Sequence, residues 1–189
     1  MSARWLAVVL IVLVALAVVA WGASRLLHRT TRPAQVTGTA TPAPPAAQTP
    51  HITATLFYAA ADGQSLAAVK QDVPLASDIV AQVREILQIQ FEAAPAGYLS
   101  TIPKGTALKA FYVTDRGDAF VDVSGDISKM HPGGTFNELL TVDTIVDAIT
   151  ANLPAVHRVQ ILVDGQQVDT IAGHVDVRHP LERDMTFVK

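Results

Sequence analysis

The sequence contains no cysteine among its 189 residues. This absence excludes disulfide bonds, thiolate metal sites, a cysteine nucleophile and a lipid-modified N-terminal cysteine. A chain without cysteine suits an oxidising outer compartment as well as the cytoplasm, so the compartment stays open. The chain also lacks the G-x-S-x-G, H-E-x-x-H, Walker and dinucleotide-binding glycine patterns. We therefore expect no enzymatic activity, no catalytic residues and no cofactor.

Acidic residues are missing from the first third of the chain. Residues 1–61 hold four arginines and no Asp or Glu, whereas residues 62–189 hold 10 basic and 17 acidic residues, a net charge of −7. A domain this acidic does not attract nucleic acid by counterion release, so no nucleic-acid partner is expected. It is also repelled by anionic lipid, which fits a domain held away from a membrane surface.

Charged residues are absent from the segment Trp5–Ala23. As a helix this segment spans roughly 28 Å, close to the hydrocarbon thickness of a bilayer. Trp5 and Trp21 bracket the apolar run, at the depth where indole rings favour the two interfaces. We expect residues 1–29 to form an uncleaved membrane anchor. The alternative is a signal peptide cleaved after Ala20, which would leave bulky Trp21 at the start of the mature chain.

Two sequence features predict opposite orientations for this anchor. Only Arg4 and the terminal amine precede the span, while three arginines follow it, and this bias places the rest of the chain in the cytoplasm. Residues 30–50, however, hold five of the eleven prolines and read as an extended linker that lifts a domain from a membrane face. With the family resemblance described below, we favour an exported C-terminal domain.

Residues 51–189 are predicted to form one small folded domain. The first helix is expected to follow Ser77 as its N-cap, with Ile79, Val83, Ile86, Leu87 and Phe91 on one face. The expected strands are 52–58, 66–73, 108–114, 119–123, 159–163 and 168–171. The order ββαββαββ predicts an α/β or α+β fold with two helices on one face of a sheet.

The second helix has the clearest start signal. Thr135-Phe-Asn-Glu138 is a capping-box sequence, in which Thr135 caps the helix and Glu138 reaches back to the cap. An apolar stripe that includes Ile145 runs from there to about Asn152, before Pro154. We expect Ile145 to be buried against the sheet.

Histidines and carboxylates suggest few candidate sites. His174, Asp176 and His179 could begin a metal cluster, but zinc needs a further ligand, and a partly exposed strand end is the simpler interpretation. The segment His131–Thr135 precedes a helix N-terminus, where backbone amides bind anions, although the same residues also serve to turn the chain. No metal site is predicted.

Two further groups have alternative interpretations. Asp143 and Asp147 lie one helical turn apart on the second predicted helix. They could form an acidic face that binds a partner, or they could simply be part of the solvated helix surface. The loop residues Tyr98, Leu99 and Ile102 could form an apolar docking surface or cover the core. Four other aspartates are spaced too loosely for an EF-hand loop: Asp115, Asp118, Asp122 and Asp126.

Five short motifs in order resemble the GerMN domain family. The resemblance covers roughly Ile52 to Asp184. The motifs are Leu99-Ser-Thr-Ile-Pro-Lys-Gly-Thr106, Ala119-Phe-Val-Asp-Val-Ser124, Gly133-Gly134 before a Glu-bearing helix, Val156-His-Arg-Val-Gln-Ile-Leu-Val-Asp-Gly165, and Gly173-His-Val-Asp-Val177 with Pro180-Leu181.

This resemblance implies a bacterial envelope protein outside the cytoplasmic membrane. GerM proteins act in sporulation and germination, their domain resembles ring-building motifs of assembly complexes, and other members occur beside cell-wall amidases or in lipoproteins. No catalytic residues are established for the family. The first hypothesis is therefore a single-pass membrane protein with a non-enzymatic interaction or assembly domain, whose partners are envelope proteins or further copies of itself. The alternative is a peptidoglycan-binding accessory or hydrolase.

Overall fold

The computed structural model describes residues 50–189. The predicted anchor, residues 1–29, and the predicted linker before Pro50 lie outside these residues. Within 50–189, no helix is both long enough and apolar enough to cross a membrane.

The first sheet has three antiparallel strands. Its strand order is β2-β1-β3, with β1 (His51–Ala60) in the centre, β2 (Leu66–Pro74) on one side and the short β3 (Tyr98–Leu99) on the other. β1 and β2 pair in unbroken register from His51 opposite Pro74 to Ala59 opposite Leu66. The two strands expected from β-branched and aromatic residues are confirmed, each slightly longer than predicted.

The second sheet combines antiparallel and parallel pairs. β4 and β5 form the predicted hairpin, and β5 runs parallel to its next neighbour, β6. Because parallel neighbours need a crossover, the chain returns through two helices between them. The strands are β4 (Leu108–Val113), β5 (Asp118–Val123), β6 (Arg158–Val163), β7 (Gln166–Gln167) and β8 (Leu181–Glu182), and the helices are α3 (Asp126–Lys129) and α4 (Thr135–Asn152).

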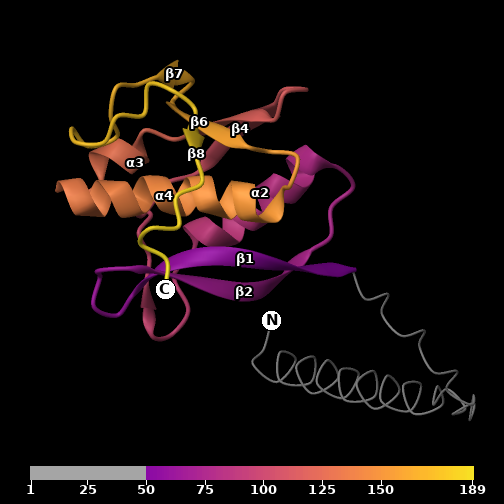
Figure 1. Ribbon diagram of the computed structural model, residues 1–189, viewed down its shortest axis with the longest axis horizontal. Helices are drawn as coiled ribbons and strands as arrows, with labels where there is room; N and C mark the ends of the chain where they lie inside the picture. The colour runs from indigo at the N-terminus through magenta and orange to yellow at the C-terminus, as the bar shows by residue number, and fades with distance from the viewer. Residues whose placement is uncertain (1–49) are drawn as a thin grey trace, which may run out of the picture. The chain divides into compact units, whose positions relative to one another are not determined.

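The helices α2 (Ile79–Phe91) and α4 lie between the two sheets, as Figure 1 shows. α4 contacts β1 on one side and β6 on the other, and α2 likewise contacts both β2 and β4. The α+β class is confirmed, but the predicted arrangement of two helices on one face of a single sheet is wrong. The physical reason is visible in α4, where every residue from Leu140 to Thr150 is buried. A helix buried all round needs cover on more than one face.

β3 pairs with β1 only at Ala59 and Ala60, and two amide side chains complete the rest of that edge. Gln90 of α2 accepts the N–H of Phe57 at 2.9 Å and donates to its carbonyl at 2.7 Å. Asn152 of α4 does the same for Thr55, at 2.8 and 2.7 Å. These amides take the place of a neighbouring strand, so the edge of β1 is satisfied although helices pack against it.

Both predicted helix caps need correction. Asp78, not Ser77, caps α2 by accepting the N–H of Ala81 at 2.9 Å. Thr135 is the first residue of α4 rather than its cap, and the cap residue is Gly134, at φ 87° and without a side-chain bond. A positive φ suits glycine and would strain most other residues.

Other predictions for this region have mixed outcomes. α4 does end at Asn152, and Ile145 is fully buried. The strand predicted at 168–171 is absent, and the hairpin after β6 ends with the two-residue β7.

Candidate functional site

Two loops meet at the N-terminal half of α4 around a pocket of about 180 Å³. One loop runs from β3 to β4 and carries the first family-like motif, Leu99–Thr106. The other joins α3 to α4 and carries His131 and Pro132. Leu140 and Thr141 of α4 line the pocket between them.

Thr141 ties both loops to α4. Its hydroxyl donates to the carbonyl of Thr101 at 2.7 Å and lies 3.1 Å from Nε2 of His131. One turn later, Thr144 accepts the hydroxyl hydrogen of Thr101 at 2.8 Å. Both threonines are fully buried, so these bonds hold the two half-buried loops against α4.

His131 is fixed as a neutral ring. Its Nδ1 accepts the N–H of Gly133 at 3.0 Å, which leaves the proton on Nε2, where it is donated to Thr141. Burial lowers the pKa of His131 and outweighs the opposing attraction of Glu138. The histidine therefore shapes the turn before α4, and the structural interpretation of His131–Thr135 is the one that its contacts support.

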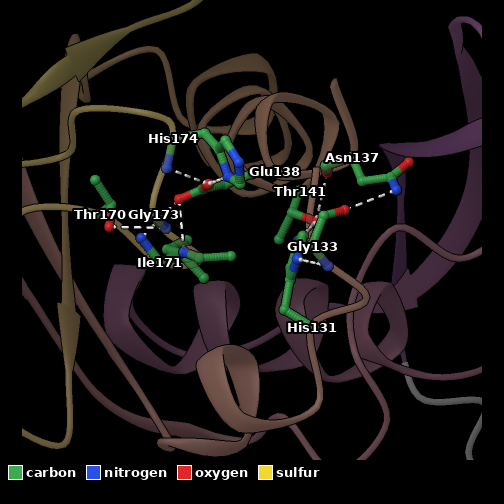
Figure 2. A network of polar contacts seen from close by, with 10 residues as sticks. His131, Gly133, Asn137, Glu138, Thr141, Thr170, Ile171, Gly173 and His174 are labelled. Carbon is green, nitrogen blue, oxygen red and sulfur yellow. Dashed lines mark hydrogen bonds and ion pairs between the residues drawn. The ribbon is translucent and has the colours of Figure 1, made fainter. Parts of the chain in front are cut away.

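Glu138 points away from this pocket into the loop after β7 (Figure 2). One carboxylate oxygen accepts the N–H groups of Ile171 and Ala172, at 2.8 and 2.7 Å. The other oxygen accepts the N–H of His174 at 2.8 Å and lies 3.2 Å from the Nδ1 of that residue. The predicted reach of Glu138 back to Thr135 is wrong, because this loop offers the carboxylate three backbone donors.

The charge of Glu138 is kept although its side chain has no exposed surface. Burial alone would raise the pKa of Glu138, but the backbone N–H groups of Ala172, His174 and Ile171, together with the His174 side chain, lower it below its ordinary value. A carboxylate held by several N–H donors prefers its ionised form. Glu138 thus acts as the anchor of the loop 170–174.

The loop residues Tyr98, Leu99 and Ile102 divide between the two interpretations, exposed surface and core cover. Tyr98 is 37% exposed and Leu99 is 51% exposed, whereas Ile102 is buried at 5%. The ring of Tyr98 lies 6.4 Å from that of Tyr58, centroid to centroid, and so rests on the sheet. Met130, which precedes His131, is 60% exposed. Apolar side chains are therefore presented to solvent beside the pocket.

Two of the three candidate metal residues, His174 and Asp176, are engaged in other contacts. His174 contacts Glu138, and Asp176 pairs with Arg178 at 2.6 Å. In residues 50–189, no group of three or more His, Asp or Glu side chains could hold a metal ion.

Asp143 and Asp147 are buried, at 6% and 0% exposure, so neither forms the solvated surface or the exposed acidic face that the sequence suggests. Desolvation raises the pKa of Asp143 to about 7 and that of Asp147 to about 6. One oxygen of each carboxyl is buried with no hydrogen-bond partner among the described residues. The segment after β8 lies over them, since the N–H of Asp184 reaches Asp147 at 3.3 Å.

The remaining aspartates have local roles. Asp118 pairs with Arg158 at 2.7 Å, and Asp122 accepts the N–H of Gly165 at 2.7 Å. Asp126 accepts the hydroxyl hydrogen of Ser124 at 3.1 Å. Asp118 and Asp122 therefore tie β5 to β6 and to the turn after β6, and Asp126 fixes the turn after β5.

Sequence reasoning missed Thr141, which lines the pocket, and Thr144, which bonds to the pocket residue Thr101. Thr141 and Thr144 are three residues apart, among the apolar residues Leu140, Val142 and Ile145. Buried hydroxyls at that spacing lie on one face and need partners, which is the signal that could have identified them.

Solved structures share this fold. The first GerMN domain of the sporulation protein GerM from Bacillus subtilis matches with a TM-score of 0.56 at 16% identity, over 70% of this chain and 98% of that one. A Clostridium perfringens protein described as a candidate lipoprotein matches with a TM-score of 0.52 at 22% identity, over 71% and 89%. The tandem GerMN domains of B. subtilis GerM match with a TM-score of 0.50 at 15% identity, over 71% and 46%.

The sequence comparisons point the same way. No curated protein matches the chain. The family profile Germane, described as sporulation and spore germination, matches residues 55–169, which is more than half of the sequence. The chain therefore belongs to the Germane, or GerMN, family, which is linked to sporulation and germination.

Proposed function

We propose that this chain is a membrane-tethered, non-enzymatic interaction module of the bacterial cell envelope. The observation that carries the proposal is the exposed apolar surface of Tyr98, Leu99 and Met130 beside the α4 pocket. Exposed apolar residues around a concave site are typical of protein docking surfaces.

The geometry behind this surface supports docking rather than chemistry. The pocket hydroxyls of Thr141 and Thr101 are occupied, since Thr141 donates to the carbonyl of Thr101 and Thr101 donates to Thr144. His131 uses both ring nitrogens within the fold and is held neutral. A general base needs a free lone pair facing a substrate, and this ring has none to offer.

The membrane tether rests on the apolar segment Trp5–Ala23 and on the relatives. A lipoprotein description accompanies one protein of the same fold, and the GerM domains belong to a sporulation protein. We place the C-terminal domain outside the cytoplasm, on a linker of residues 30–50. Alkaline phosphatase fused after Lys189 should be active, since it folds only after export. A stable but inactive fusion would place the domain in the cytoplasm.

Docking is tested by site-specific photo-crosslinking in cells. A benzoylphenylalanine at position 99 should give a discrete adduct with an envelope protein. The same probe at the exposed Gln166 of β7 is the matched control and should give none. A Leu99→Asp substitution should remove an adduct formed from position 130 while leaving the unfolding midpoint unchanged. Equal adducts from positions 99 and 166, or crosslinking of position 99 only to peptidoglycan, would contradict the proposal.

A further inference from the structure

A second concave surface lies at the opposite end of α4, outside the site described above. It is a groove of about 750 Å³, and its charged rim includes Arg116, Arg158 and Arg183. These three arginines come from the β4–β5 turn, the start of β6 and the segment after β8. In a domain with 17 acidic and 10 basic residues, this gathering of cations reverses the local charge.

The rim is held rigidly by Gly117. Its carbonyl accepts the N–H groups of His157 and Arg158 at 2.8 and 3.3 Å, which fixes the β4–β5 turn to the connection after α4. A Cβ at position 117 would lie 2.6 Å from the carbonyl oxygen of Ala155 and 2.7 Å from Cδ2 of His157. Only glycine allows this approach, so Arg116 is placed at the groove by close backbone packing.

Arg183 is held in place by contacts with α4. Its Nε donates to the hydroxyl of Thr150 at 3.0 Å, and the next residue, Asp184, bonds to Asp147. Arg158 is paired with Asp118. Among residues 50–189, no carboxylate lies within ion-pair distance of Arg116 or of Arg183. Their terminal N–H groups are free for a planar oxyanion, which guanidinium groups bind in a bidentate manner.

The surroundings of these cations limit the occupant. Glu182 lies in the same groove, and the C-terminal end of α4 adds at most about half a negative charge. The excess of positive charge is therefore modest and does not suit a dense polyphosphate. Ala151, Pro154 and Val156 supply apolar wall between the arginines. A ligand that carries single, spaced carboxylates with small apolar side chains between them would match this arrangement of separated arginines and apolar wall.

We propose that the groove binds an acidic peptide segment of a protein partner, with its carboxylates on Arg116 and Arg183. The inference rests on the interaction role proposed above and names a second contact surface for it. The segment lies in extended form across the end of α4, so that both arginines engage carboxylates of the same chain.

The test uses the full chain in nonionic detergent and a fluorescent peptide of alternating Glu and Ala. The peptide should bind, and the matched Lys–Ala peptide should not. Arg116→Gln with Arg183→Gln should weaken binding about tenfold or more. Arg84→Gln is the matched control and should leave binding unchanged, since Arg84 is exposed on α2 and forms no ion pair within residues 50–189. A urea midpoint equal to that of the parent chain shows that the double variant is folded.

Three results would overturn the inference: equal affinity in the double variant, equal loss in the Arg84 control, or tighter binding of inorganic pyrophosphate than of the acidic peptide. Failure here is distinguishable from failure of the proposed function. Leu99→Asp should leave peptide binding intact, and the double arginine variant should leave the crosslink from position 99 intact.

Discussion

The Glu138 carboxylate accepts the backbone N–H of His174 at 2.8 Å and lies 3.2 Å from the Nδ1 of the same residue. A helix residue thereby holds a loop 36 positions away in the sequence. Glu138→Ala leaves three backbone N–H groups of that loop without acceptors. We expect a loss of about 2–5 kcal/mol in the free energy of unfolding.

Urea unfolding followed by circular dichroism measures this loss. Glu92→Ala, at an exposed residue, is the control and should change the midpoint little. Hydrogen exchange should show faster exchange at Ile171, Ala172 and His174 in Glu138→Gln, which keeps the shape but supplies a single acceptor oxygen. Unchanged exchange at these amides would contradict the anchoring role.

The buried pair Asp143 and Asp147 predicts a pH dependence. Their folded pKa values of about 7 and about 6 lie above the ordinary 3.8, with Asp184 and Arg183 facing the pair from the covering segment. The folded state therefore binds more protons than the unfolded state between about pH 4 and 7. Stability from this pair should be complete below pH 4, fall as the pH rises to 7, and level off above.

The urea midpoint at successive pH values tests this dependence. The double substitution Asp143→Asn and Asp147→Asn should flatten the decline between pH 4 and 7. Asp62→Asn, at an exposed turn residue, should leave it in place. A decline of the same size in the double variant would assign the titration to other groups.

Removing the amide of Gln90 should lower the free energy of unfolding, because this amide bonds to the edge of β1. Gln90→Leu keeps the volume but leaves the N–H and carbonyl of Phe57 buried without partners. We expect a loss of about 2–6 kcal/mol, since two buried groups lose their partners and each unsatisfied buried group costs about 1–3 kcal/mol. Thermal or urea unfolding gives the value. Gln88→Leu, at an exposed residue of the same helix, should be close to neutral, and a similar loss there would remove the special role of Gln90.

Gly117 and Gly63 form a matched pair of glycines. Both have positive φ, at 81° and 67°. A Cβ at 117 meets backbone and ring atoms below 3 Å, whereas a Cβ at 63 meets nothing within 4 Å. Gly63→Ala should cost about 1 kcal/mol from backbone strain alone, and Gly117→Ala about 2–4 kcal/mol because of the added overlap. Equal midpoints for the two variants would contradict the close packing at 117.

Local patterns were sufficient for the elements with a strong period. The apolar stripe of α4 predicted its end at Asn152 and the burial of Ile145. Runs of β-branched, aromatic and other apolar residues predicted β1, β2 and the two strands of the β4–β5 hairpin. These features depend on interactions within a few residues, so the sequence carries them directly.

Where a polar side chain points was decided only by the tertiary structure. The spacing of Thr135 and Glu138 allows a capping box, but three backbone donors from the distant 170–174 loop bind the carboxylate more strongly. Asp143 and Asp147 read as surface because the segment that covers them, around Asp184, lies far along the chain. Local spacing cannot show such long-range partners.

For the overall architecture, too, the sequence determined one part and the tertiary structure another. The sequence by itself determined an α+β chain of the GerMN family, with an acidic domain and no cysteine chemistry. Only the tertiary structure decided that two sheets enclose the helices, because burial on every side of α4 requires cover from both. It also decided that arginines from three distant segments share one groove, because Gly117 packs the β4–β5 turn against the start of β6 and Thr150 of α4 holds Arg183 beside them.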